Sequence, residues 1–90
     1  MKLDKLDNFG KLKIRGIQHG FITIPANDII YLKTDYPIYG YESFTFVSTE
    51  TFNDLLYEVS VFNYDTNGIN LKNANTDYGI SRIYMIIFWE

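Results

Sequence analysis

Apolar and polar residues alternate along much of the chain, which is the period of a β-strand with one buried face. The pattern is present at residues 11–15 and 38–47, and three further strand-like runs occur at residues 21–24, 28–33 and 80–89. Two glycines bracket residues 17–19, so the pattern places a turn or hairpin tip between the runs at residues 11–15 and 21–24. Residues 28–33 are apolar on both faces, which favours a central strand. The last run is long and apolar enough to lie between two neighbours.

The period changes after residue 49. Phe52, Leu55, Leu56 and Val59 stand at i, i+3, i+4 and i+7, the spacing of one helical face. Thr51, with an acid three residues later, resembles an N-terminal capping box. This pattern predicts a short helix at about residues 50–60 that packs on one sheet face. A weaker pattern of the same kind at residues 3–9 predicts one or two helical turns.

Alternating runs at residues 61–64 and 69–71 flank Asp65-Thr66-Asn67-Gly68. Asn-Gly between such runs is a strong signal for a β-hairpin. Residues 73–79 are polar and rich in turn formers, which predicts a loop. Together these elements predict a single α+β domain over residues 1–90. It should hold a mainly antiparallel sheet of about five to seven strands and one short helix packed on one face.

The chain contains no cysteine, which excludes disulfides, a thiolate nucleophile and a cysteine-type zinc site. Its longest apolar stretch, Ile83–Trp89, is too short to span a membrane. No signal-peptide pattern opens the chain. We therefore expect a soluble cytoplasmic protein without a membrane partner.

Residues with catalytic potential are few. His19 is the single histidine and stands between glycines, and no nucleophile elbow or phosphate-binding loop occurs. Glu42 shares its predicted strand face with apolar residues. It is therefore either a buried general acid or base, or a residue placed where that face reaches solvent. The sequence predicts a protein that is not an enzyme and has no cofactor and no metal site.

Charge is unevenly placed along the chain. Residues 1–15 carry a net charge of +3 and residues 16–90 a net of −6, which sum to the −3 of the whole chain. Lys and Arg supply most non-specific nucleic-acid affinity by neutralising phosphates, so direct nucleic-acid binding is disfavoured. Two interpretations of the acidic surface stay open: it keeps a small protein in solution, or it attracts a basic partner.

Eight tyrosines are many for a core this small, and three of them fall within residues 36–41. Tyrosine combines an apolar ring with a polar tip and is enriched at protein interfaces. Alternatively, the rings cover an outer sheet face or stack on single-stranded bases, although stacking also needs a basic groove. The protein-interface hypothesis predicts a partner-binding surface made of Asp35, Tyr36, Tyr39, Tyr41 and Glu42.

Abundant Ile and Asn with little Ala suggest an AT-rich genome, such as that of a low-GC bacterium or its phages. With the acidic charge and the tyrosines, this predicts a phage or mobile-element inhibitor acting in the host cytoplasm. Such a protein would block the basic nucleic-acid-binding surface of a partner protein, in the manner of anti-CRISPR proteins.

The stretch Phe21–Lys33 resembles the opening strands of LytTR-type DNA-binding domains of bacterial response regulators. Thr51–Val59 would stand for the helix of that family, and residues 69–71 for its hydrophobic-Asn-hydrophobic strand. Residues 64–67 occupy positions that are basic or histidine in the family. The resemblance implies a DNA-binding transcription regulator, which is the alternative function.

Overall fold

The computed structural model describes residues 13–49 and 59–90 of the chain. In these residues six β-strands and one short 3-10 helix follow each other in the order β1 (Ile14–Ile24), β2 (Ile29–Lys33), η2 (Tyr41–Ser43), β3 (Phe44–Ser48), β4 (Val59–Asp65), β5 (Gly68–Asn73) and β6 (Ile80–Trp89).

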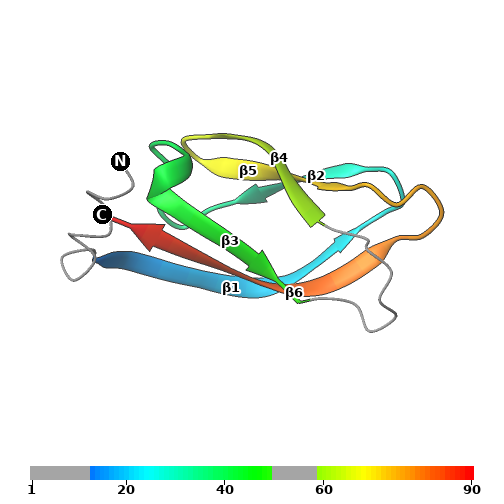
Figure 1. Ribbon diagram of the computed structural model, residues 1–90, viewed down its shortest axis with the longest axis horizontal. Coiled ribbons are helices and arrows are strands. Elements are labelled where there is room, and N and C mark those ends of the chain that lie inside the picture. Colours follow the sequence, from blue (N-terminus) through cyan, green and yellow to red (C-terminus); the bar gives the residue numbers. More distant parts are fainter. Residues whose placement is uncertain (1–12, 50–58) are drawn as a thin grey trace, which may run out of the picture.

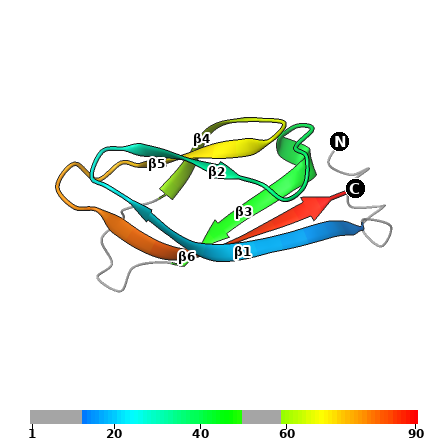
Figure 2. The ribbon, with the colours of Figure 1, turned by 180° about the vertical axis from the view of Figure 1, so that it is seen from behind.

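The strands form two antiparallel sheets of three strands each, which lie face to face (Figure 1). Sheet A has the order β1-β6-β3, and sheet B has the order β2-β5-β4. The chain passes from β1 in sheet A to β2 in sheet B, returns to sheet A for β3, and crosses again to β4. Figure 2, seen from behind, shows β1 in the lower of the two layers and β2 in the upper one.

The core lies between the two sheets because alternate residues of each strand point inward. Along β6 every second side chain from Ile80 to Phe88 is buried, and the residues between them are exposed or half-buried. Ile69 and Leu71 of β5 face them from sheet B and are fully buried, as is Ile24 of β1. Burial along β6 therefore alternates strictly, although its sequence is apolar on both faces and places Arg82 inward and Ile83 outward.

Several sequence-based predictions are confirmed. The strands are antiparallel, and β6 lies between β1 and β3 as its length and apolar character indicated. The β4–β5 hairpin forms where Asn-Gly predicted it, with Asp65 opposite Gly68 and Thr66-Asn67 as the connecting loop. The polar stretch after β5 is a loop that leads to β6.

The α+β prediction is wrong, because the described residues are mainly β and form two sheets without a helix on a face. Of the predicted helix at 50–60, residues 50–58 lie outside the described residues, as do residues 3–9. Val59 and Ser60 belong to β4, where they pair with Asn73 and Lys72 of β5. At these two positions strand pairing with β5 overrides the local helical spacing.

The turn predicted between Gly16 and Gly20 does not exist, because β1 continues through both glycines, with a register shift against β6 between Ile14 and Gly16. Each glycine instead leaves room for an aromatic ring that crosses the strand. A Cβ atom on Gly16 would collide with the ring of Tyr36, and one on Gly20 would lie 3.0 Å from Cε2 of Tyr84. The glycines therefore mark close approach of side chains, not a change of chain direction.

Two strand predictions also need correction. β2 is an edge strand that pairs with β5 alone in its sheet, although its residues are apolar on both faces. The strand predicted at residues 38–47 begins only at Phe44. Gly40, at φ 142° and ψ 169°, and the η2 turn after it interrupt the alternation that suggested a longer strand.

Candidate partner-binding site

The segment between β2 and β3, residues 34–43, is fixed to its neighbours by backbone hydrogen bonds. The N–H groups of Thr34 and Ile38 donate to the carbonyl oxygens of Asn67 (3.0 Å) and Thr66 (2.9 Å), in the β4–β5 turn. The N–H group of Asp35 donates to Oε1 of Gln18 at 2.7 Å. These bonds hold the segment against both the hairpin tip and β1.

A tight turn follows at Gly40, whose φ of 142° is a conformation that L-residues with side chains rarely adopt. The hydroxyl of Ser43 closes this turn. It accepts a hydrogen bond from the N–H of Tyr39 (3.0 Å) and donates one to the carbonyl of Gly40 (2.7 Å). The turn therefore holds the tyrosines on either side of Gly40 in fixed directions.

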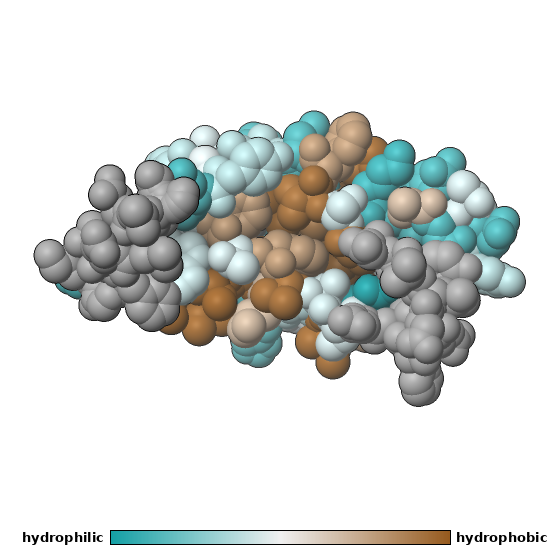
Figure 3. Space-filling model, in the orientation of Figure 1, coloured by the Kyte–Doolittle hydropathy of each residue, from teal (hydrophilic) through white to brown (hydrophobic). Residues whose placement is uncertain are grey.

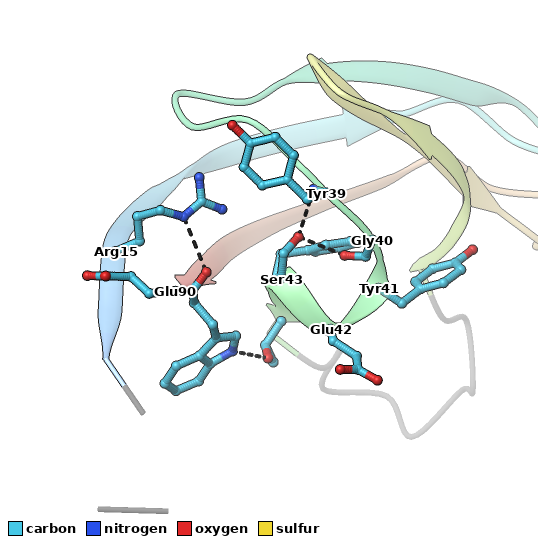
Figure 4. A pocket seen from close by; sticks show the side chains of 10 residues that line it. Arg15, Tyr39, Gly40, Tyr41, Glu42, Ser43 and Glu90 are labelled. Carbon is cyan, nitrogen blue, oxygen red and sulfur yellow. Dashed lines mark hydrogen bonds between the residues drawn. The ribbon is translucent and has the colours of Figure 1, made fainter. Parts of the chain in front are cut away.

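This turn forms one wall of an open groove at the end of the sandwich where β3 begins and β6 ends (Figure 4). We call it the end groove, and its lining residues are Arg15, Tyr39, Gly40, Tyr41, Glu42, Ser43, Phe44, Thr45, Trp89 and Glu90. Three of the five residues predicted from the sequence as a partner-binding surface are in this set.

Arg15 is the organising residue of the groove. Its Nε donates to the carbonyl of Trp89 (3.2 Å) and its Nη2 to the carbonyl of Pro37 (2.8 Å). Its guanidinium carbon also lies 5.5 Å from the ring centre of Tyr39 and 5.6 Å from that of Phe88. A guanidinium at this range is attracted to the negative face of an aromatic ring. Arg15 thereby links β1, the end of β6 and the tyrosine segment.

Tyr39 and Tyr41 are the most exposed aromatic residues of the groove, with exposed fractions of 75% and 60%. Each ring nevertheless contacts another side chain of the protein. Tyr39 lies over Arg15, and Tyr41 contacts Tyr64 edge to face, with ring centres 4.5 Å apart. An exposed ring held in one orientation loses little entropy when a partner covers it, which makes it an efficient anchor.

The other predicted site residues lie in two different environments. Asp35 and Glu42 are exposed, and Glu42 belongs to the η2 turn rather than to a strand face shared with apolar residues. Tyr36 turns inward instead, where its ring packs over Gly16 and lies 5.0 Å from the ring centre of Phe88. Tyr36 therefore supports the site from the interior and does not present its ring as an anchor.

Seven lining residues of the groove were missed by sequence reasoning, and three of them hold it together. Arg15 ended a basic run that looked like the polar face of a strand, Ser43 stood within a predicted strand, and Trp89 ended a core strand. The roles of Arg15 and Trp89 arise from a contact between residues far apart in the chain, whereas Ser43 acts within its own turn. No local pattern in the sequence predicts a contact between residues so far apart.

The acidic side chains of the described residues are all exposed, whereas the arginines are buried or half-buried. Arg82 is 5% exposed and donates to the carbonyl of Thr49, and Arg15 is half-buried in the contacts above. Lys13 and Lys33 are exposed, and Lys72 is half-buried. The described surface is therefore more acidic than the residue counts alone indicate.

Near the end groove, the tip of the β4–β5 hairpin holds an acid with a shifted pKa. The pKa of Asp65 is lowered by the N–H of Asn67, which donates to its Oδ1 at 2.8 Å, and by the hydroxyl of Tyr31, which donates at 2.9 Å. The pKa of Tyr31 is raised by partial desolvation and by this bond to a carboxylate. The ionised form of Asp65 therefore stabilises the hairpin tip.

This geometry predicts a pH dependence. Because the folded-state pKa of Asp65 is lowered, its contribution is complete above the unfolded-state value of about 4 and is lost as pH falls through the folded-state value. Asp65→Asn should lower the melting temperature near pH 7, and this difference should shrink as the pH falls below about 4. Thermal melts of both proteins across this range measure it, and a difference that does not vary with pH would contradict it.

The described residues gather no group of three His, Cys, Asp or Glu side chains able to hold a metal ion. Within the same residues no helix has the length and apolar character needed to cross a membrane. Comparison with protein-family models, with curated proteins and with solved structures gives no match.

Proposed function

We propose that the protein is a non-enzymatic binding module whose end groove holds a basic surface of a partner protein. The observation that carries this proposal is that exposed aromatic rings and exposed acids line the same groove. Tyr39 and Tyr41 supply the anchors, and Glu42 and Glu90 line the same groove. Aromatic anchors surrounded by polar groups are the usual composition of an energetically dominant interface centre.

The mechanism is steric occupation. The exposed acids steer a basic partner toward the groove and raise the association rate, while the tyrosines determine how long it stays. A partner that uses its basic surface to hold nucleic acid would lose access to that nucleic acid while the module is bound. We therefore propose an inhibitor of a nucleic-acid-handling protein, such as a phage or mobile element would encode.

The charge distribution supports protein binding over direct DNA binding. A DNA-binding surface needs several exposed Lys or Arg side chains, because phosphate contacts supply most of the affinity. In the end groove the cation is Arg15, whose Nε and Nη2 already donate to backbone carbonyls. A regulator of the LytTR-like kind would instead bind duplex DNA with an affinity that falls steeply with salt.

Cross-linking from the groove tests the proposal. A photoreactive phenylalanine at position 39 should capture a basic protein in an extract of the organism that carries the gene. The same group at Tyr78, which is 62% exposed and outside the end groove, should not. Heparin, a polyanion, should compete for the partner's basic surface and abolish the cross-link.

Charge variants sharpen the test. Glu42→Lys should slow association with the captured partner and reduce its salt dependence, while Asp77→Lys, an equal change outside the end groove, should not. Equal cross-linking from both tyrosine positions, or capture that heparin does not affect, would exclude this mode of binding. Salt-sensitive binding of the wild-type protein to duplex DNA would favour the transcription-regulator alternative.

A further inference from the structure

The outer face of sheet A is apolar although it points away from the core. Six large apolar side chains of the three strands lie exposed on it, with exposed fractions from 38% to 66%: Ile14, Ile17, Phe21, Val47, Ile83 and Met85. Apolar surface is visible along the lower side of the molecule in Figure 3, the side on which sheet A lies. Soluble monomers rarely expose an apolar patch of this extent without a partner for it.

Strand register makes this face continuous. Phe21 of β1 stands opposite Ile83 of β6, and Ile17 stands opposite the half-buried Ile87. On the other side of β6, Val47 of β3 stands opposite Met85. Directly opposed residues of antiparallel strands have Cβ atoms about 5 Å apart, so the members of each pair are neighbours. In the rows that cross all three strands, His19 stands beside Met85 and Thr45 beside Ile87.

Four polar side chains on the same face are already paired with each other. The hydroxyls of Thr23 and Ser81 are hydrogen-bonded at 3.0 Å, and the indole N–H of Trp89 donates to the hydroxyl of Thr45 at 2.9 Å. Covering a polar group costs free energy mainly when it loses a partner in water. Because these four groups have partners within the sheet, covering them carries little polar penalty, and His19 is the polar side chain of the face outside these pairs.

Charge narrows the choice of occupant. In β1, β3 and β6 no Lys, Asp or Glu lies on this face, and the two arginines of these strands make the inward contacts described above. His19 is the titratable group that these strands place there. The outer face of sheet B differs, since it presents Lys33, Lys72 and Asn70. The occupant of the sheet A face is therefore an uncharged apolar surface, unlike the basic partner proposed for the end groove.

The area fits a small dimer interface. About ten paired residues of β1 and β6, at about 3.3 Å per residue and with strands about 4.8 Å apart, together with the shorter β3 make a face of roughly 400 Å² in projection. The accessible area of such a corrugated face is larger and approaches the ~800 Å² per partner of a standard interface. A second copy of this chain supplies a surface of matching size, polarity and charge.

We propose that the outer face of sheet A binds the same face of a second copy, so that the two sandwiches stack sheet on sheet. A two-fold interface of this kind is self-complementary, and packed sheets lie about 10 Å apart. The centre of the interface is near His19 and Met85, which are opposed midway along the β1–β6 ladder. Tyr39 and Tyr41 lie outside this face, whereas Thr45 and Trp89 belong both to it and to the lining of the end groove.

Sedimentation velocity of the full chain over roughly 1–300 µM tests the proposal. The mass should rise from 10.6 kDa toward twice that value, with a dissociation constant in the micromolar range, as suits an interface at the small end of the standard size. Ile83→Asp should weaken dimerisation at least a hundredfold. Phe62→Asp adds the same charge at a 55% exposed residue of β4 in sheet B and should leave the constant within about threefold.

A second variant on the outer face of sheet A distinguishes loss of the dimer from misfolding of the monomer. Ile17→Asp lies on β1 and not on β6, and it should also abolish the dimer while the circular dichroism spectrum stays that of the wild type. Three results would overturn the proposal. They are a wild-type chain that stays monomeric over the whole range, a dimer that survives both sheet A variants, and a dimer that Phe62→Asp disrupts equally.

Discussion

Phe88→Ala should lower the free energy of unfolding by about 3–5 kcal/mol, the cost of deleting a large buried aromatic ring. Phe88 is fully buried in β6, where its ring packs against Tyr36 and lies 5.6 Å from the guanidinium carbon of Arg15. Deleting the ring would leave a cavity in the core between the sheets, and it would remove the ring contacts that Phe88 makes with Tyr36 and Arg15. Since small domains have about 5–15 kcal/mol of total stability, the variant should melt far below the wild type.

Phe62→Ala is the matched control, because it removes the same ring from a site that is 55% exposed on sheet B. It should change the free energy of unfolding by no more than about 0.5 kcal/mol. Urea denaturation followed by tryptophan fluorescence measures both variants. Equal losses for the two phenylalanines would show that the interior between the sheets is not the main source of stability.

Asn73→Ala should have the second largest effect, a loss of about 3 kcal/mol or more. The side chain is fully buried at the end of β5, and its amide nitrogen donates to the carbonyls of Ile24, Pro25 and Tyr78 at 3.0–3.2 Å. Its oxygen accepts from the N–H of Asn75 at 2.9 Å. One side chain thus joins the β1–β2 corner to the β5–β6 loop. Its removal leaves several buried polar groups without partners, at about 1–3 kcal/mol each.

Thr23→Ala provides the comparison for Asn73, since it removes the exposed hydrogen bond between Thr23 and Ser81. Its cost should stay near 0.5 kcal/mol, because water replaces the lost partner. Thermal melting of the two variants under the same conditions separates the effects. If Asn73→Ala were as mild as Thr23→Ala, the network at this corner would not hold the sheets together.

Local patterns in the sequence identified those elements whose cause is local. The β4–β5 hairpin follows from its turn residues, and the central position of β6 follows from its long apolar run. The glycines of β1 misled the prediction, because a glycine that bends the chain and one that admits a ring look alike in sequence. The ring over Gly16 comes from Tyr36, which is twenty positions along the chain.

The candidate site was predictable only in part, because some of its features have local causes and others depend on contacts between residues far apart in the chain. Clustered tyrosines and acids marked residues 35–42, and the structure shows that Tyr39 and Tyr41 are exposed while Tyr36 is turned inward. Which ring points outward depends on the Gly40 turn and on Arg15, whose partner Trp89 is 74 positions away. The continuous apolar face of sheet A depends likewise on register between distant strands, which alternation alone does not define.

Competition between the protein and nucleic acid for the captured partner tests the central claim most directly. The partner's affinity for its nucleic acid is measured by fluorescence anisotropy with increasing amounts of wild-type protein, of the double variant Tyr39→Ala, Tyr41→Ala, and of Tyr78→Ala as control. The wild type and the control should displace the nucleic acid. The double variant should need about thirtyfold more protein, which corresponds to the loss of about 2 kcal/mol expected for hot-spot residues. Displacement by the double variant at wild-type concentrations, or no displacement by the wild type, would contradict the assignment of the end groove as the inhibitory surface.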